Sequence, residues 1–512
     1  MKLPARTELG FRSRSHTYTL IIGVVAGMLA AGLAIPFMFG TPLETVSATG
    51  SSRLNGITST SVSSTASGAG TAAASTASGS GTGGAGAGAG TAGGGTASGS
   101  SPLAGGTQAV AGLTASDRGV TPTTITIAFL IVDLGGVSKV GFSVPGFDPK
   151  SQEAYINSFL DNVNNHGGIL GRQIVPVFVT YDPTNQSTST AACRTATQDH
   201  AIFAAIDSGG GLNEPGQLCF TQQNHTPLIG VGAFGTAPEI YDGSGGYLFT
   251  VDASGLRALA NLAYLLDARG VLKGKRIGIV DRDFPGTLQT VTDGLIATLQ
   301  QFGYEVAYRS DLSMDDGTAA SQVPVAAQQM QAHGVDTVFL LTDFIIGSGF
   351  VQSADKSAYH PLYLASDFES MTNDTAVQSM PSTFQAFGVT ASRIGEWRVG
   401  LPEPAVDAAC RQIYAAATGS DPQRSENAYG GMDLACGLVD LIVRGATPAG
   451  PDLTRDAFVA NVQQVGRIDF PFFGGFSYSP GKFDGGDDVR MLAFDSGCMC
   501  WLPQGDFVAP RF

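Results

Sequence analysis

Charged residues are scarce in this chain, and positive ones are scarcer than negative ones. Of its 512 residues, 14% are charged, with 28 Lys and Arg against 43 Asp and Glu, so the net charge is -15. The part that we expect to fold contains no cluster of Lys and Arg. Nucleic acid is therefore excluded as a partner, because neutralising its phosphates needs such a cluster.

Catalytic and metal-binding patterns are also missing. The chain has six His, no Gly-x-Ser-x-Gly elbow and no visible pair of nucleophile and base. No His stands near any Cys at the spacing of a zinc site, and the Asp-rich segment 484–488 misses the EF-hand pattern, which favours a hairpin turn. We therefore expect no enzyme activity, no metal and no cofactor.

A long apolar run near the N-terminus follows a basic flank. Lys and Arg outnumber acidic residues in 1–18, and residues 19–40 carry no charge. Roughly 20 apolar residues span a bilayer, so we expect a transmembrane anchor, with 1–18 as a cytoplasmic tail and the rest of the chain outside. Residues 46–48 also fit a signal-peptide cleavage site, and cleavage there would give a secreted protein. The length of the run favours the anchor.

The next segment, 41–116, is a flexible linker in our interpretation. From Thr49 to Ser116 the chain is almost wholly Gly, Ala, Ser and Thr, and Arg53 is its only charged residue. This composition cannot bury enough apolar surface to offset the entropy lost on ordering. It predicts a tether that holds the remaining chain clear of a membrane.

Short apolar runs alternate with longer amphipathic ones from Asp117 to Phe512. The short runs are continuously apolar, which is typical of parallel strands buried on both faces. Regular alternation of strand and helix predicts the α/β class, with doubly wound sheets and two lobes. The expected strands lie within 124–132, 172–181, 200–207, 226–232, 275–281, 335–343 and 360–367.

Several segments resemble one family in the same order along the chain. The most specific is 158–194, which reads SFLDNVNNHGGILGRQIVPVFVTYDPTNQSTSTAACR; the others are 226–233, 247–254, 275–286, 302–318 and 334–344. They are similar to the type I periplasmic-binding proteins for branched-chain amino acids (Leu, Ile, Val), which serve ABC importers. The resemblance covers nearly all of Val120 to Pro503.

The resemblance implies two Rossmann-like lobes, three chain crossings and a ligand in the cleft between the lobes. It implies a monomer whose partners are a small-molecule ligand, the ABC permease subunits and, through the N-terminal helix, the membrane. We expect lobe 1 to comprise 117–250 and 403–465, and lobe 2 to comprise 251–402 and 466–512.

Candidate ligand contacts follow the strands, because open parallel sheets bind ligands at the carboxyl ends of their strands. Three strands of the second lobe end in an Asp-Phe pair, in which Phe offers an apolar face and Asp a partner for a ligand ammonium. Alternatively, each Asp caps the following helix and each Phe fills the core. The candidate residues of the second lobe are Asp283, Phe284, Asp343, Phe344, Asp367 and Phe368.

The first lobe offers a Ser-Gly run and an Ala-Phe pair after its strands. The resemblance implies that the Ser-Gly run presents backbone N–H groups to a ligand carboxylate, although glycine here replaces the family's hydroxyl residues. It also favours Asp343 as the ammonium partner in the second lobe. The candidate residues of the first lobe are Ser208, Gly209, Gly210, Gly211, Ala233 and Phe234.

Six cysteines lie in a chain that we expect outside the cytoplasm, where disulfides are stable. Cys193 and Cys219 have a separation that resembles a disulfide found in part of the family. Cys410 and Cys436 fall on neighbouring late helices, and we expect them to pair. Cys498 and Cys500 stay unassigned, with pairing to each other in a turn as one alternative.

These observations predict an extracytoplasmic solute-binding protein of an ABC importer. Its ligand would be a small organic molecule: an amino acid, an amide or an amine-like compound. Two alternatives stay open, a ligand-sensing receptor ectodomain and a cell-surface scaffold that uses the same fold.

Overall fold

The computed structural model describes Leu103 and residues 108–139, 144–232 and 236–512, which belong to one compact unit. The predicted membrane segment, 19–40, and most of the predicted linker lie outside the described residues and stay predictions. Within these described ranges, no helix has the length and apolar character needed to cross a membrane.

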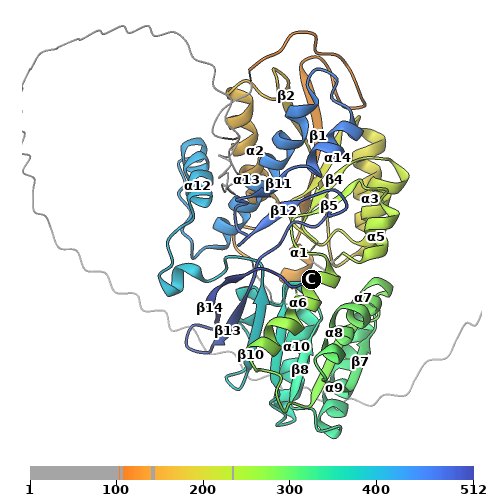
Figure 1. Ribbon diagram of the computed structural model, residues 1–512, viewed down its shortest axis with the longest axis vertical. Coiled ribbons are helices and arrows are strands. Elements are labelled where there is room, and N and C mark those ends of the chain that lie inside the picture. Colours follow the sequence, from red (N-terminus) through yellow and green to blue (C-terminus); the bar gives the residue numbers. More distant parts are fainter. Residues whose placement is uncertain (1–102, 104–107, 140–143, 233–235) are drawn as a thin grey trace, which may run out of the picture. The chain divides into compact units, whose positions relative to one another are not determined.

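Five parallel strands form the first sheet, which lies in the upper half of Figure 1. They pair in the order β2-β1-β3-β4-β5, and every neighbouring pair is parallel. This sheet and its covering helices are called lobe 1 below. Its strands are β1 (Thr124–Val132), β2 (Gln173–Tyr181), β3 (Ala204–Asp207), β4 (Leu228–Gly230) and β5 (Leu248–Thr250).

Alternate side chains of β1 enter two different cores. Phe129 lies in the core with α2 and α13, whereas Leu130 lies in the core with α3 and η3. A strand covered on both faces must be apolar throughout, which is why the sequence shows a continuous run here. The helices of lobe 1 are α1 (Gly135–Lys139), α2 (Pro149–Asn165), α3 (Gln186–Arg194), η2 (Thr195–Asp199), α4 (Glu214–Leu218), η3 (Cys219–Gln223), α5 (Pro238–Gly243), α12 (Ala405–Thr418), α13 (Asn427–Ala446), η7 (Thr447–Ala449) and α14 (Arg455–Val462).

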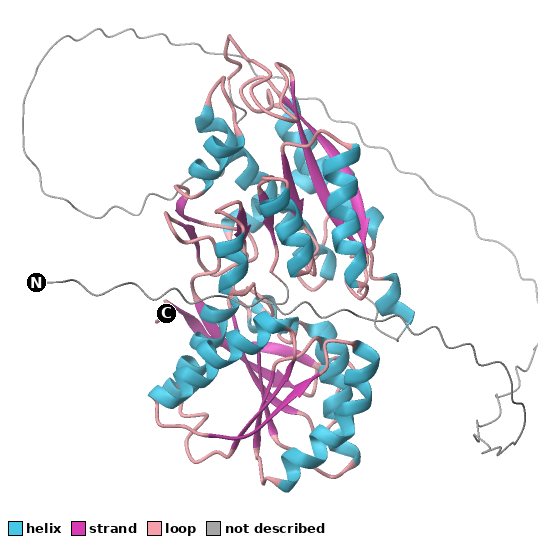
Figure 2. Cartoon of the chain, turned by 90° about the vertical axis from the view of Figure 1, so that its right-hand side faces the viewer, coloured by secondary structure: helices cyan, strands magenta, loops and turns pink. Residues whose placement is uncertain are grey.

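The second sheet has the order β14-β13-β10-β9-β8-β6-β7. Strands β6 to β10 are parallel, β13 is antiparallel to β10, and β14 pairs antiparallel with β13 in an edge hairpin. Figure 2 shows its strands between helices on both sides. The strands are β6 (Ile277–Arg282), β7 (Val306–Leu312), β8 (Thr337–Leu340), β9 (Leu362–Ser366), β10 (Gln385–Thr390), β13 (Val489–Asp495) and β14 (Cys500–Val508).

Two cores flank this second sheet, which with its helices is called lobe 2. Ile279 packs in the core that contains α6 and η4, whereas Val280 packs with α9 and α10. The helices of lobe 2 are α6 (Gly255–Ala268), α7 (Pro285–Thr290), η4 (Val291–Ile296), α8 (Ala297–Gln301), α9 (Asp316–Ala332), α10 (Phe344–Lys356), η5 (Phe368–Ser370), α11 (Asp374–Val377) and η6 (Glu396–Val399).

The parallel strands of the two sheets follow the same order. Counted from its own first strand, each runs 2-1-3-4-5, which is a doubly wound order with a switch point between its first and third strands. The predicted α/β class with parallel-dominated sheets is therefore confirmed. Loops at the carboxyl ends of these strands are the expected place for a ligand.

The chain crosses between the sheets three times, and the crossings lie side by side. They follow β5, β10 and the small sheet of β11 (Gly466–Ile468) and β12 (Phe476–Tyr478). The N–H of Gly485 donates to Asp252 O at 3.1 Å, and the N–H of Gly474 donates to Ala391 O at 2.9 Å. The small sheet packs on lobe 1, where Tyr478 of β12 contacts Phe249 of β5 with ring centroids 5.3 Å apart. The third crossing therefore comes only after β12.

The end of the predicted linker contacts lobe 1. Leu103 is buried in the core with α2 and α13, and the N–H of Val110 donates to Leu170 O at 3.1 Å. Arg172, which is fully buried, donates through Nη2 to Thr114 O at 3.0 Å. The folded part therefore begins before the expected limit at residue 117.

We expect a shortened chain that begins at residue 117 to be less stable than one that begins at residue 102. The shorter chain loses the burial of Leu103 and one acceptor of the Arg172 guanidinium, effects of about 1–3 kcal/mol each. Urea unfolding of the two chains measures the difference, and Leu103→Ala in the longer chain isolates the apolar part. Equal midpoints would show that residues 103–116 add nothing to stability.

All six cysteines lie in the described residues and form three disulfides. Cys193 pairs with Cys219 and Cys410 with Cys436, as the sequence predicted. The first bond joins α3 to η3, and the second joins α12 to α13. The unassigned pair, Cys498 and Cys500, forms a third disulfide at the turn between β13 and β14.

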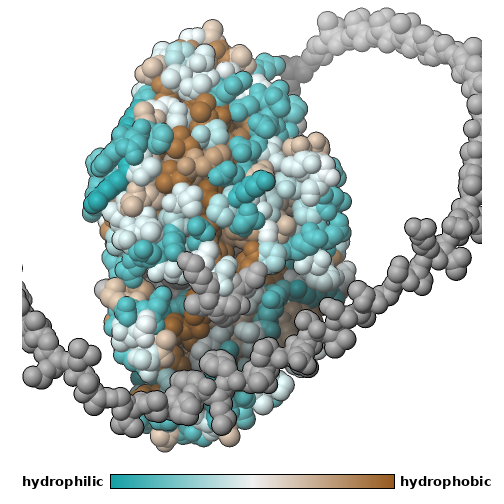
Figure 3. Space-filling view, turned by 180° about the vertical axis from the view of Figure 1, so that it is seen from behind, coloured by the Kyte–Doolittle hydropathy of each residue, from teal (hydrophilic) through white to brown (hydrophobic). Residues whose placement is uncertain are grey.

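Few large apolar side chains of the described residues are exposed. Figure 3 shows one face, on which apolar surface forms bands between polar areas. The exposed large apolar residues are Val110, Val175, Met314, Val325, Trp397, Val399, Leu401 and Phe512. The cores on the two faces of each sheet thus contain most of the large apolar side chains.

Candidate functional site

A small cavity lies where the crossings meet the carboxyl ends of the strands. Its volume is about 20 Å³, which is room for about one water molecule. Lobe 1 and the first crossing contribute Gly232 and Asp252, and lobe 2 contributes the end of β9 and the end of β10. The lining residues are Gly232, Asp252, Ala253, Ala258, Ser366, Asp367, Phe368, Val389, Thr390, Ala391 and Val489.

Two carboxylates face this cavity. Asp252 follows β5, and its Oδ1 accepts a hydrogen bond from the N–H of Gly232 at 2.7 Å. Asp367 follows β9, and its Oδ2 accepts from the N–H of Ala391 at 2.7 Å, while its Oδ1 accepts from the hydroxyl of Thr372. Within the described part of the chain, neither carboxylate forms an ion pair with Lys, Arg or His.

Desolvation makes both carboxylates weak acids. Burial, together with the neighbouring charges of Asp367 and Asp484, raises the pKa of Asp252 to about 7 against the lowering effect of the Gly232 N–H. Burial also raises the pKa of Asp367. A positive group placed in the cavity would favour the ionised form of both, which is the electrostatic basis for binding a cation here.

Asp343, the residue favoured from sequence, already has a cation partner within lobe 2. Its Oδ2 lies 2.5 Å from Nη1 of Arg282, and its Oδ1 caps α10 by accepting from the N–H groups of Ile345 and Ile346. Arg282 is buried and also contacts Asp316 at 2.8 Å. This carboxylate is thus neutralised internally and acts as a helix cap.

The three Asp-Phe pairs have different surroundings. Asp283 is exposed and accepts from the N–H of Met314, while Phe284 lies under the guanidinium of Arg282. Phe344 packs against the core of α9 and α10, and Phe368 is buried in the core that contains α6 and η4. Only the Asp367–Phe368 pair lines the cavity.

The Ser-Gly run after β3 turns its backbone towards a carboxylate of the protein itself. Asp207 is buried, and its Oδ1 accepts from Tyr181 Oη at 2.9 Å and from the N–H of Gly209 at 3.4 Å. Burial raises the pKa of Asp207 to about 7, against the lowering effect of Tyr181 and of the N–H groups of Gly209, Leu212 and Gly210. The N–H of Gly209 thus donates to a carboxylate of the protein itself.

The remaining residues of the first-lobe prediction do not reach the cavity or fall outside the described residues. Ser208 is buried and donates its hydroxyl to Leu130 O at 3.3 Å. Gly210 and Gly211 adopt positive φ values of 69° and 96°, which lets the loop fold back on Asp207. Ala233 and Phe234 lie outside the described residues.

Sequence reasoning missed Asp252. Like the three predicted aspartates, it follows a short buried strand, so the same strand-then-Asp signal identifies it. Unlike them, it is separated from its strand by one residue and is not followed by Phe.

The family model described as "periplasmic binding protein" matches residues 145–494. Among solved structures, a type 1 periplasmic binding protein from Bordetella pertussis Tohama I is 14% identical, with a TM-score of 0.57, and the match covers 74% of this chain and 99% of that one. A branched-chain amino acid ABC transporter protein from Thermus thermophilus with bound valine is 13% identical, with a TM-score of 0.56 and coverage of 76% and 98%.

A fatty acid ABC transporter substrate-binding protein from Thermomonospora curvata is 15% identical, with a TM-score of 0.56, covering 79% of this chain and 97% of that one. No curated protein matches the chain. Identities this low establish the fold and leave the ligand open. The family model, in contrast, spans well over half of the chain, including most strands of both sheets and all three crossings. The chain therefore belongs to the periplasmic binding protein family.

Proposed function

We propose that this protein is the extracytoplasmic solute-binding subunit of an ABC importer, and that its ligand is a small, amine-like organic cation. The observation that carries the proposal is the pair Asp252 and Asp367. These two carboxylates come from opposite sides of the interlobe cavity and have no cation partner among the described residues. A ligand ammonium supplies that partner.

The ligand class has to be inferred from side chains, because the fold does not select it. Similar structures contain ligands as different as valine and 3,4-dihydroxybenzoic acid. Here the N–H of Gly209 after β3 donates to the buried Asp207, and a carboxylate beside this loop disfavours an anionic ligand group. The charge balance of the described site therefore disfavours a free carboxylic acid and favours a cation.

Binding has to be coupled to lobe movement. Pockets for small organic ligands measure about 300–1,000 Å³, far more than a cavity of about 20 Å³ holds. The lobes must separate to admit the ligand and then close on it, and a ligand that contacts both lobes favours the closed state. Ligand-dependent closure is what an importer needs to distinguish loaded from empty protein.

A thermal-shift screen tests the proposed ligand class. Primary amines, diamines, guanidines, amino acids and aromatic acids are added separately, and the unfolding temperature is recorded for each. We expect stabilisation by amines or guanidines and none by carboxylic acids that lack a cationic group. Stabilisation by simple acids alone would contradict the proposal.

Affinity for the cationic ligand should rise with pH. The ligand needs ionised carboxylates, and burial holds the pKa of Asp252 at about 7 in the free protein. Each ligand bound below this pH displaces a proton, so the association constant should fall by up to about tenfold per pH unit. Calorimetric titration between pH 5 and pH 8 measures the slope.

Asp252 gives the stability of the ligand-free protein the opposite pH dependence. Because the folded pKa of Asp252 is raised, its contribution to stability is present at low pH and lost as the pH rises through about 7. Asp252→Asn should reduce the pH dependence of ligand affinity and that of the free energy of unfolding, since the amide does not titrate. A pH-independent affinity in the unchanged protein would show that the carboxylates do not contact the ligand.

A further inference from the structure

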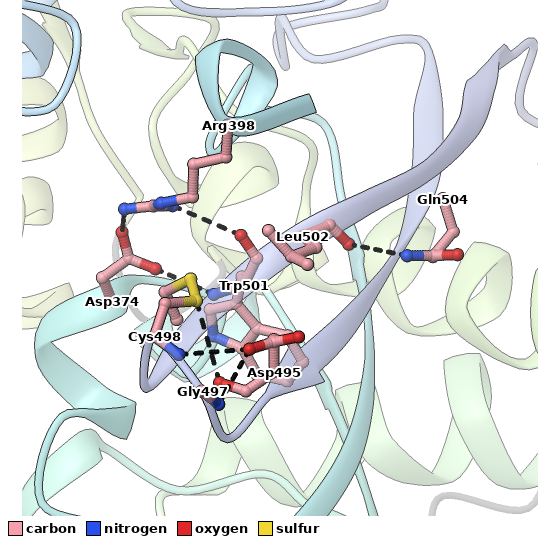
Figure 4. Close-up of a disulfide and its surroundings, with 9 residues drawn as sticks. Asp374, Arg398, Asp495, Gly497, Cys498, Trp501, Leu502 and Gln504 are labelled. Atoms are coloured by element: carbon pink, nitrogen blue, oxygen red, sulfur yellow. Dashed lines mark hydrogen bonds and ion pairs between the residues drawn. A yellow bond between two sulfur atoms is a disulfide. The ribbon is translucent and has the colours of Figure 1, made fainter. Parts of the chain in front are cut away.

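The three disulfides differ in how far a reagent can reach them. Cys193, Cys219, Cys410 and Cys436 are buried, and their bonds join helices inside the cores of lobe 1. Cys498, in contrast, is exposed. It lies at the turn of the β13–β14 hairpin (Figure 4). Its partner, Cys500, is 3% exposed. One sulfur of this bond therefore faces solvent while the other faces the protein.

The hairpin tip is held by contacts that do not depend on the disulfide. Oδ1 of Asp495 accepts from the N–H of Gly497 at 2.8 Å and from the N–H of Cys498 at 3.1 Å. Asp495 also pairs with Cys500 in the strand ladder. Between the cysteines, Met499 has a φ of 51°, a left-handed conformation that non-glycine residues rarely adopt. The disulfide closes a ring of the three residues Cys498, Met499 and Cys500. Opening it frees Met499 from this ring and leaves the turn in place.

Residues beyond the disulfide are anchored to other elements of lobe 2. The N–H of Trp501 donates to Asp374 Oδ1 at 3.0 Å, and its indole N–H donates to Met371 O at 3.2 Å. Arg398 binds both Asp374, at 2.5 Å, and Trp501 O, at 3.3 Å (Figure 4). Strand β14 therefore keeps its position when the bond at the tip opens.

We propose that the Cys498–Cys500 disulfide is a site of thiol–disulfide exchange, open to a dithiol reductant outside the cytoplasm. A reductant thiolate attacks Sγ of Cys498, the S–S bond breaks, and its electron pair leaves on Sγ of Cys500. The second thiol of the reductant then attacks the mixed disulfide and releases Cys498. Two electrons and two protons pass to the protein, and the reductant becomes a disulfide.

Graded reduction of the full, oxidised chain tests the site. Dithiothreitol is added in increasing amounts, free thiols are blocked with iodoacetamide, and the six cysteines are quantified by peptide mapping. Cys498 and Cys500 should open at about tenfold lower dithiothreitol than the other four, because exposed disulfides are the labile ones. The unfolding temperature should change little at that point.

Two matched variants test which sulfur is attacked. In Cys500→Ser the exposed Cys498 is free, and in Cys498→Ser the buried Cys500 is free; each is incubated with glutathione disulfide and the mixed disulfide is measured by mass. Cys500→Ser should form it about tenfold faster or more, since access limits exchange. Simultaneous opening of all three bonds, free thiols at 498 and 500 in the oxidised protein, or equal rates in the two variants would each overturn the proposal.

Discussion

Replacing Asp367 with alanine should weaken binding of a cationic ligand by about 2–5 kcal/mol, the range for truncating one partner of a buried, hydrogen-bonded charge pair. Asp367 lines the interlobe cavity, and its partners among the described residues are uncharged: the N–H of Ala391 and the hydroxyls of Thr372 and Thr390. Its negative charge is therefore left for the ligand. Calorimetric titration with the strongest amine from the thermal-shift screen measures the change.

Asp343→Ala is the matched control for that experiment. Asp343 also follows a strand of lobe 2, but Arg282 at 2.5 Å already neutralises it. Its removal should leave affinity nearly unchanged and lower the free energy of unfolding by about 1–3 kcal/mol, because a buried guanidinium loses one acceptor. Asp283→Ala, at an exposed aspartate, should change neither quantity much. If Asp343→Ala loses affinity and Asp367→Ala does not, the cavity is not the ligand site.

The fold was predictable from sequence because its information is local. Each strand of a parallel sheet covered on both faces needs a continuous apolar run, and such runs mark the strands on both sides of the crossings. Two of the three disulfides were also predicted, Cys193–Cys219 from the resemblance to the family and Cys410–Cys436 from their place on neighbouring helices, whereas Cys498 and Cys500 stayed unassigned. Leu103 was not predictable, because one leucine in a segment of Gly and Ala does not reveal whether it is buried.

The site was less predictable because it depends on contacts between strands. Arg282 stands beside Asp343 only because β6 and β8 are neighbours in the sheet, paired from Ile277 and Thr337 onwards. Without that strand order, Asp343 and Asp367 look equivalent in the sequence. The Ser-Gly run posed a different problem, since the sequence does not reveal that the N–H of Gly209 donates to Asp207 in a loop where Gly210 and Gly211 have positive φ values.

A side chain at position 286 should hold the two lobes apart. Gly286, at the start of α7 in lobe 2, faces the segments that begin α4 and α5 in lobe 1. A Cβ at this position would lie 2.3 Å from Oε1 of Glu214 and 2.8 Å from Cβ of Ala237. The Glu214 carboxylate is the end of a flexible side chain and can move aside. The methyl of Ala237 is fixed to the backbone, so the lobes must separate.

Gly286→Val should therefore reduce ligand affinity by about 1–3 kcal/mol, roughly 5- to 150-fold, because the closed state now includes an overpacked contact. Small-angle scattering with ligand should report a larger radius of gyration than the unchanged protein gives. Gly349→Val is the matched control, since Gly349 also lies on a helix of lobe 2 and has open space around its Cβ position. Replacing Gly with Val raises helix propensity at both positions, so a loss of affinity confined to position 286 isolates the interlobe contact.

Removing the opposing atoms should restore closure. Ala237→Gly combined with Glu214→Ala clears both groups that a Cβ at position 286 would meet, so this background should return much of the affinity lost in Gly286→Val. Coupling of this kind is expected only between residues that touch in the ligand-bound state. If Gly286→Val binds as tightly as the unchanged protein, the contact between α7 and lobe 1 does not belong to the closed, ligand-bound state.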